Sequence, residues 1–169
     1  MTRLFTLLLV AGMALAACQP AAPPMGADGQ PIPTAYRIGT AEAAQLPFRM
    51  LDSVNSLRAA SSLQPVELNA QLTAAAATHS RDMQVQNRPW HFGSDGSSPV
   101  DRVQRAGFSG PLIGEVISET YETELETLGA WMAKPDTRRV IMSPEARTMG
   151  FSWFQENNGK IWWTLILGG

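Results

Sequence analysis

The chain offers few side chains that can carry out chemistry: two histidines and one cysteine among 169 residues. His91 is followed closely by three serines, a proximity that raises the hypothesis of a serine hydrolase. These serines are Ser94, Ser97 and Ser98. The Gly-x-Ser-x-Gly elbow of many such enzymes is missing, because residues 107–111 depart from it by one position. Serines in a glycine-rich segment favour turns, so we expect them to shape a loop rather than act as nucleophiles.

The single cysteine closes the segment Leu15-Ala16-Ala17-Cys18, which resembles the lipobox of bacterial lipoproteins. The basic Arg3 and a largely apolar run over residues 4–15 precede it, in the order of a secretory signal. The run is shorter than the ~20 residues that a membrane-spanning helix needs. We therefore expect cleavage before Cys18, acylation of Cys18 (palmitate among its lipids), export, and attachment to a membrane. Gln19, rather than aspartate, follows the cysteine, which favours the outer membrane by resemblance to the usual lipoprotein sorting rule.

Composition divides the chain into three parts. Residues 1–17 form the predicted signal peptide, residues 18–39 the lipidated cysteine with a Pro/Ala-rich linker, and residues 40–169 one folded domain. Five of the twelve prolines lie in the linker, which favours extended backbone that buries little apolar surface. The formal net charge is −2, with 13 basic and 15 acidic residues and no basic stripe, so we expect no nucleic-acid partner.

Apolar residues at helical spacing predict the main helices. One stripe covers residues 48–61 and a second covers residues 68–83. The second stripe includes His79, which we interpret as a core histidine that points into the packing face and donates one hydrogen bond. Two further helices are expected, over residues 99–105 and between a capping-box threonine at 123 and the proline at 135.

Three strands are predicted, over residues 114–121, around residues 149–153 and over residues 161–166. The last is nearly all apolar, which indicates a strand buried on both faces. Asn158-Gly159 predicts a hairpin turn before it, since both residues tolerate positive φ. Helices must then cover both faces of the sheet. The predicted fold class is α+β: a three-layer α/β/α sandwich with a small antiparallel sheet.

An ordered set of short motifs resembles the CAP superfamily, the SCP-like domain of cysteine-rich secretory, antigen-five and pathogenesis-related proteins, in its compact bacterial branch. The motifs run from the first predicted helix to the closing strand. They are Asn55-Ser56-Leu57-Arg58, His79-Ser80-x-Asp82-Met83, His91-x-Gly93-Ser94-Asp95-Gly96-Ser97, the segment Arg102 to Gly107, Gly114-Glu115, and Trp131-Met132 with Pro135, Arg138, Ile141 and Pro144. The resemblance implies the same sandwich.

The resemblance also implies a cleft lined by histidines and acidic residues. His91 and Glu115 carry over, an imidazole and a carboxylate that can hold a divalent metal or share a proton. Thr137 replaces the histidine of the bacterial Ser-Pro-Gly-His-Arg motif, so we expect no cofactor, at most weak divalent-metal binding by His91 and Glu115, and stronger binding in a Thr137→His variant. Glu119 shares a strand face with Glu115 and is a further cleft candidate.

Three functional hypotheses follow. The favoured one is an exported, membrane-anchored CAP-domain lipoprotein that binds a ligand or partner in the His91–Glu115 cleft without catalysis. For such a ligand the resemblance implies a small hydrophobic molecule, such as a sterol or lipid, or a carbohydrate-like one. The second is a hydrolase that uses His91 and Glu115 as an acid/base or metal pair. The third is a structural envelope protein with a relict site. A purely structural role for Glu115, as a buried carboxylate bonded to His91 and to backbone N–H groups, also stays open.

Overall fold

The computed structural model describes residues 36–169, which belong to a unit that begins at Ala35. Cys18, the signal peptide and most of the linker lie outside the described residues. Tyr36 and Ile38, from the segment that we assigned to the linker, pack against the core. The elements in chain order are α1 (Thr40–Ala60), β1 (Glu67–Leu68), α2 (Ala70–Gln86), α3 (Pro99–Arg105), β2 (Leu112–Glu119), α4 (Glu124–Ala133), α5 (Pro135–Ile141), β3 (Thr148–Gln155) and β4 (Ile161–Gly168).

The sheet has four strands in the order β1-β3-β4-β2. The three long strands are antiparallel, as predicted, but β1 runs parallel to β3, so the sheet is mixed. Leu68, which we predicted in a helix, belongs to β1. The helix begins only at Ala70, because the Asn69 side chain accepts a hydrogen bond from Leu72 N at 2.9 Å and caps it.

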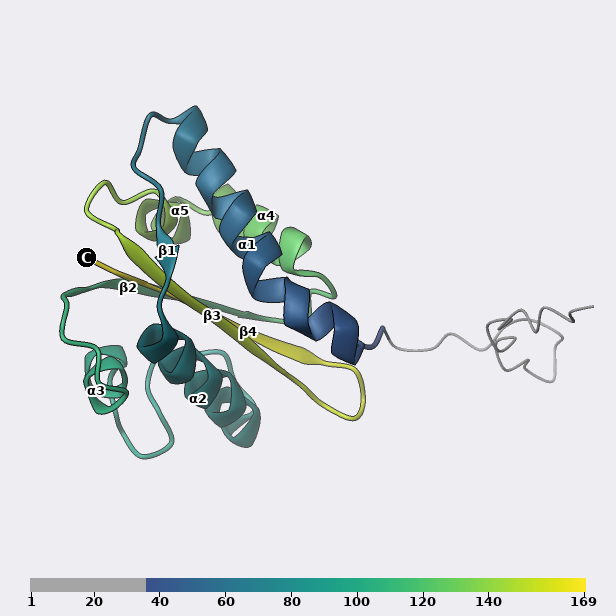
Figure 1. The fold of residues 1–169 in the computed structure, drawn as a ribbon. Helices are drawn as coiled ribbons and strands as arrows, with labels where there is room; N and C mark the ends of the chain where they lie inside the picture. Colours follow the sequence, from purple (N-terminus) through teal and green to yellow (C-terminus); the bar gives the residue numbers. More distant parts are fainter. Residues whose placement is uncertain (1–35) are drawn as a thin grey trace, which may run out of the picture. The chain divides into compact units, whose positions relative to one another are not determined.

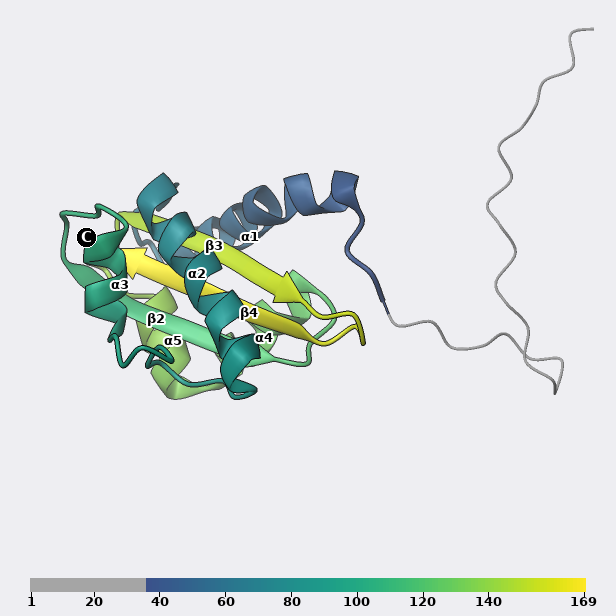
Figure 2. The same ribbon diagram turned by 90° about the horizontal axis from the view of Figure 1, so that it is seen from below.

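Helices cover both faces of this sheet (Figure 1), which confirms the three-layer sandwich. The larger core joins α1, α4 and α5 to one face, where Trp163 is fully buried. The smaller core joins α2 and α3 to the other face through Ile166. Figure 2 shows α2 lying across β3 and β4. Every residue of β4 is buried, as the apolar run predicted.

Two contacts bring α2 close to the sheet. A Cβ atom on Gly150 would lie 2.1 Å from the carbonyl carbon of Leu72, so only glycine allows this approach. The Ser80 hydroxyl donates to Thr164 Oγ1 at 2.8 Å. This close packing turns the neighbouring His79 towards the interior.

The buried face of α1 differs from the predicted stripe. Leu46, Met50, Val54 and Arg58 are buried, whereas Phe48 is 55% exposed. Arg58 is cationic yet sealed from water, and its guanidinium donates to four backbone carbonyls. The acceptors are those of Gln64, Ile141, Ser143 and Ala146. Apolar periodicity alone could not predict this buried face, because the face includes the charged residue Arg58.

The β3–β4 hairpin closes with a three-residue loop. Gly159 N donates to Glu156 O at 3.0 Å, and Glu156 N donates to Lys160 O at 2.8 Å. Within this loop only Gly159 has positive φ, at +98°, so the predicted hairpin is present but Asn158 does not use its tolerance for positive φ. Residues 157–159 thus form a three-residue hairpin loop, in which a turn is followed by the left-handed Gly159, rather than a two-residue loop.

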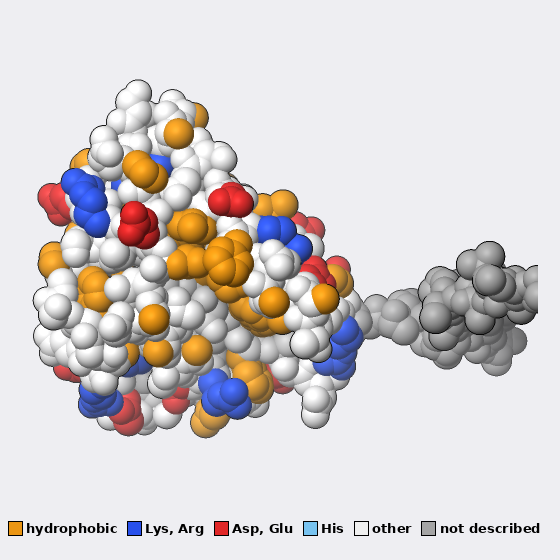
Figure 3. All heavy atoms as spheres, viewed as in Figure 1, with side chains coloured by type: hydrophobic (Ala, Val, Ile, Leu, Met, Phe, Trp, Pro, Cys, Tyr) orange, Lys and Arg blue, Asp and Glu red, His pale blue; other side chains and the backbone are white. Residues whose placement is uncertain are grey.

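Among the helices of residues 36–169, none is both long and apolar enough to cross a membrane. On the face shown in Figure 3, acidic and basic side chains are interspersed around a central group of hydrophobic ones.

Candidate functional site

Glu115 is the centre of a buried polar cluster on the α2–α3 face of the sheet. Its carboxylate is 1% exposed, and its Oε1 atom lies 2.9 Å from His91 Nδ1. Arg102, on α3, places Nη2 at 2.9 Å from both carboxylate oxygens. The structure therefore joins His91 and Glu115, as the resemblance implied, and adds Arg102 to them.

Arg102 also fastens the loop that carries His91. Its guanidinium donates to the carbonyl oxygens of His91, at 2.8 Å, and Ser97, at 3.1 Å. Arg102 lies in a helix of only seven residues that Ser98 and Asp101 start with a reciprocal capping box. One buried cation thus connects β2, α3 and the loop before it.

Electrostatics keep Glu115 charged. Burial opposes its ionisation, but the hydrogen bond from His91 and the Arg102 guanidinium outweigh burial and hold the pKa of Glu115 below its usual value. An ionised carboxylate only accepts hydrogen bonds, so His91 Nδ1 is the donor. When the His91 ring is neutral, its Nε2 atom is then a hydrogen-bond acceptor. The His91 side chain is half exposed.

His79 lies beneath the cluster and is fully buried, which confirms the prediction of a core histidine. Its Nε2 atom is 3.6 Å from Glu115 Oε1, beyond hydrogen-bond distance. Within residues 36–169 neither ring nitrogen of His79 has a hydrogen-bond partner, so the prediction that it donates one hydrogen bond was wrong. Burial lowers the pKa of His79, as does the charge of Arg102, so its ring is neutral at pH 7.

The other two predicted cleft residues lie elsewhere. Glu119 shares the strand face of Glu115, but its carboxylate pairs with Lys160 at 2.5 Å. Thr137 donates to Trp131 O at 2.5 Å. Its helix, α5, covers the opposite face of the sheet, where a Cβ on Gly114 would meet Val140. The structure thus does not bring Thr137 into the Glu115 cluster, and stronger metal binding in a Thr137→His variant stays a prediction.

The three serines near His91 have structural partners. Ser94 donates to Asp82 from both its amide and its hydroxyl, at 2.7 and 2.5 Å. The Ser97 amide donates to Asp95, and the Ser98 hydroxyl caps α3. None of these hydroxyls is hydrogen-bonded to His91 in the described part of the chain, in line with turn-forming roles.

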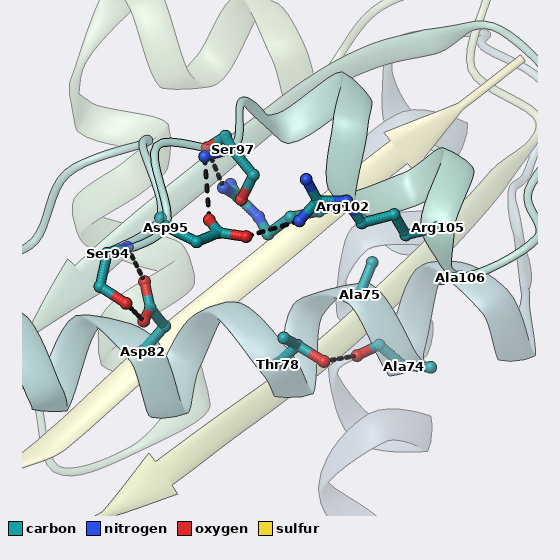
Figure 4. A pocket seen from close by; sticks show the side chains of 11 residues that line it. Ala74, Ala75, Thr78, Asp82, Ser94, Asp95, Ser97, Arg102, Arg105 and Ala106 are labelled. Atoms are coloured by element: carbon teal, nitrogen blue, oxygen red, sulfur yellow. Dashed lines mark hydrogen bonds and ion pairs between the residues drawn. The ribbon is translucent and has the colours of Figure 1, made fainter.

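A cavity of about 420 Å³ adjoins the cluster through Arg102; we call it the α2–α3 pocket. Its polar wall is the loop of residues 93–97, and its apolar floor consists of Ala74, Ala75 and Ala106. Figure 4 shows Asp95 on this wall, bonded to Ser97 and Arg105, and Asp82 on α2, bonded to Ser94 of the wall. Because Asp95 pairs with Arg105 at 2.6 Å, Asp82 is the pocket carboxylate without an ion pair among the described residues.

The side chains that contact Glu115 include few metal ligands. His91 is one, but the other contact is Arg102, a cation that does not bind metals. Within residues 36–169, no group of three or more His, Cys, Asp or Glu side chains could hold a metal ion. Tight protein zinc sites use three or four such side chains.

The sandwich and the His91–Glu115 pair define an SCP-like domain. The profile described as "Cysteine-rich secretory protein family" (CAP) matches residues 51–167. The chain therefore belongs to the CAP family.

Two of its relatives come from bacilli. The chain is 27% identical over 120 residues to "Uncharacterized protein YkwD" of Bacillus subtilis strain 168, a match that covers 71% of the chain and 46% of YkwD. It is similar in structure to an extracellular protein containing an SCP domain from Bacillus anthracis, with a TM-score of 0.68 and 19% identity over 79% of the chain and 45% of that protein. The chain thus spans less than half the length of either relative.

An outer surface protein of Borrelia burgdorferi has a similar fold, with a TM-score of 0.69 and 16% identity. That alignment covers 80% of the chain and 98% of the Borrelia protein. At such identity the likeness concerns the fold alone.

The residue that sequence reasoning missed is Arg102. It stands in the motif segment from Arg102 to Gly107, and a charged residue in a short helix indicates solvent exposure by default. One signal could have found it: a buried glutamate on a strand needs a cation, and Arg102 lies within the same motif series.

Proposed function

We propose that the protein is an exported, membrane-tethered binding protein that holds a small, neutral, carbohydrate-like ligand in the α2–α3 pocket without converting it. Tethering is supported by the lipobox-like segment ending at Cys18. Export is supported by that segment and by the similarity in structure to an extracellular protein of Bacillus anthracis and an outer surface protein of Borrelia burgdorferi.

The observation that carries the proposal is the engagement of Glu115. Arg102 donates to both carboxylate oxygens of Glu115, and His91 Nδ1 donates a second hydrogen bond to Oε1. The Glu115 side chain is also sealed from water. A carboxylate so occupied can neither take a proton from a substrate nor bind a metal. Its role in this proposal is to hold Arg102 and the loop that forms the pocket wall.

The polar wall of the pocket supports a neutral, hydroxyl-rich ligand, whose carbon skeleton would lie on the apolar floor. Two carboxylates, two arginines and the hydroxyl-bearing residues Thr78, Ser94 and Ser97 line it, and its volume lies in the range of small-molecule sites. The Asp82 carboxylate has no ion pair among the described residues, and it already accepts hydrogen bonds from Ser94 and Gln86. Its charge repels anions, and its remaining acceptor capacity favours donors such as sugar hydroxyl or amide groups.

A pocket-filling variant tests this proposal. Ala74 and Ala77 are both exposed residues of α2, but only Ala74 lines the pocket. Calorimetric titration with a panel of neutral disaccharides should show one binding site that Ala74→Phe abolishes and Ala77→Phe retains. Palmitate is the apolar comparison. Palmitate binding that is lost in Ala74→Phe, with no disaccharide binding, would replace the carbohydrate-like ligand by a lipid.

One observation favours a second candidate function. His91 has its Nδ1 on a buried carboxylate and its ring half exposed, the arrangement of a general base whose orienting partner is acidic. In that hypothesis His91 Nε2 deprotonates water or a substrate hydroxyl. It predicts turnover that His91→Gln eliminates, whereas the binding proposal predicts that His91→Gln changes ligand affinity at most.

A further inference from the structure

A second polar groove follows the outer edge of β2, away from the Glu115 cluster. β2 is an edge strand, because the sheet order places only β4 beside it. The groove has a volume of about 530 Å³ and is bordered by Pro89, residues 117–121 and Lys134. We call it the edge groove. Edge strands are templates for added strands unless their unpaired backbone groups are covered.

The backbone alternation shows which groups face the groove. Thr120 N donates to Ile161 O of the β4 strand, so Thr120 and Ser118 direct their backbone groups towards β4. Ile117 and Glu119 then direct theirs outward. The Ile117 carbonyl confirms this direction, because it accepts a hydrogen bond from the Trp131 indole at 3.1 Å.

The remaining outward groups lack partners. Over residues 36–169, no hydrogen bond to a side chain or to another segment engages the N–H of Ile117 or the N–H and C=O of Glu119. The neighbouring Ser118 hydroxyl is buried and also has no partner among the described residues. The backbone N–H of Ile117 and the N–H and C=O of Glu119 can therefore form strand-like hydrogen bonds with the backbone of a bound peptide.

The groove also carries an unbalanced positive charge. Glu119 is neutralised by Lys160, whereas no carboxylate of residues 36–169 lies within 4.0 Å of the Lys134 ammonium. Lys134 follows Trp131 by one turn and its amide bonds to Trp131 O, so it stands at the Ile117 end. Thr137 fixes this corner by donating to the carbonyls of Trp131 and Lys134.

The edge groove is short. At one end the Trp131 indole already covers the Ile117 carbonyl. At the other end Thr120 has a left-handed backbone, with φ +85°, which ends the straight strand before the exposed Tyr121. A long strand cannot continue through it, but the last two or three residues of a chain can fit.

We propose that the edge groove binds the C-terminal end of an extended peptide, paired antiparallel to β2 at Ile117 and Glu119. In this direction the peptide's C-terminus comes to the Ile117 end, where Lys134 receives the terminal carboxylate. The proposal does not depend on the ligand of the α2–α3 pocket.

The test uses the 15N-labelled full chain and a random tetrapeptide pool, with free or amidated C-termini. The free-acid pool should shift the amide resonances of Ile117 and Glu119 and bind about ten-fold more tightly than the amidated pool, because one charge-assisted contact is lost. Lys134→Gln should remove this difference. Arg138→Gln, which deletes an exposed charge on α5 outside the groove, should keep it.

A backbone variant completes the test. Glu119→Pro removes the outward N–H without breaking a bond to β4 and should abolish binding, whereas Glu119→Gln keeps the N–H and should bind. Resonances outside the groove report whether each variant is folded. Equal binding of the two pools, or no shift at Ile117 and Glu119 at millimolar peptide, would overturn the proposal.

Discussion

Arg102 Nη2 lies 2.9 Å from both carboxylate oxygens of Glu115, and both side chains are almost sealed from water. The same guanidinium holds the carbonyls of His91 and Ser97. The pair thus ties the edge strand β2 to α3 and to the loop that lines the α2–α3 pocket. Removing either partner leaves the other as an uncompensated buried charge.

Arg102→Met should therefore destabilise the fold by about 3–5 kcal/mol, because Glu115 would stay buried without its cation. Urea denaturation measures the loss. The double variant Arg102→Met/Glu115→Leu should lose clearly less than the sum of the single variants. As a control, Arg105→Met removes an arginine whose ion pair with Asp95 is exposed, and should cost at most about 1 kcal/mol. Equal losses for Arg102→Met and Arg105→Met would contradict this account of the cluster.

Acid should weaken the fold in two stages. The pKa of His79 in the folded protein lies below its ordinary value of about 6.5. Below that pH His79 is therefore protonated more readily in the unfolded chain than in the folded one, which favours unfolding. Glu115, whose folded pKa is also depressed, loses its contribution as the pH falls further, below its ordinary value of about 4.3. Both shifts have the same sign, so the free energy of unfolding should fall from pH 7 to pH 4.

Denaturation curves at pH 7, 6, 5 and 4 measure this decline. His79→Leu should flatten the first stage, between pH 7 and 5, and leave the second. A fold that becomes more stable between pH 7 and pH 5 would show that His79 is not held neutral.

The hairpin gives a local test. Gly159 has φ +98°, a conformation that a β-branched residue resists, so Gly159→Val should destabilise the protein by more than ~1 kcal/mol. Gly159→Asn should cost less, because asparagine tolerates a left-handed backbone. Thermal melts of the two variants compare them, and a neutral Gly159→Val would place the left-handed residue elsewhere in the turn.

Anchoring is tested at Cys18. Cys18→Ser should move the protein from the membrane fraction to the soluble exported fraction, or block its processing. Fractionation followed by immunoblotting measures the change. A variant that is processed and stays with the membrane would refute lipidation at Cys18.

Local signals predicted the parts of the fold that depend on one segment alone. Residues 161–166 are apolar on both faces, and Thr123 and Glu126 form the expected capping box, each bonding to the other's backbone. The parallel β1 strand could not be predicted, because its two residues are specified by pairing with β3 rather than by their own pattern.

The site divides in the same way. His91 and Glu115 were found through motifs, but Arg102 was missed since its burial follows from the partner 13 residues away. Glu119 and Thr137 were grouped with them by strand spacing and motif position. The strand spacing correctly placed Glu119 on the same face as Glu115. The Glu119 carboxylate nevertheless pairs with Lys160 and does not join the cluster. Position in a motif does not reveal which face of the sheet the following helix covers.

The measurement that tests the central claim most directly is the fate of a disaccharide bound in the α2–α3 pocket, followed by proton NMR during prolonged incubation. We predict saturable binding of a chemically unchanged ligand, lost in Ala74→Phe and retained in Ala77→Phe and His91→Gln. Accumulation of cleaved product that stops in His91→Gln would contradict the claim and establish His91 as a catalytic base.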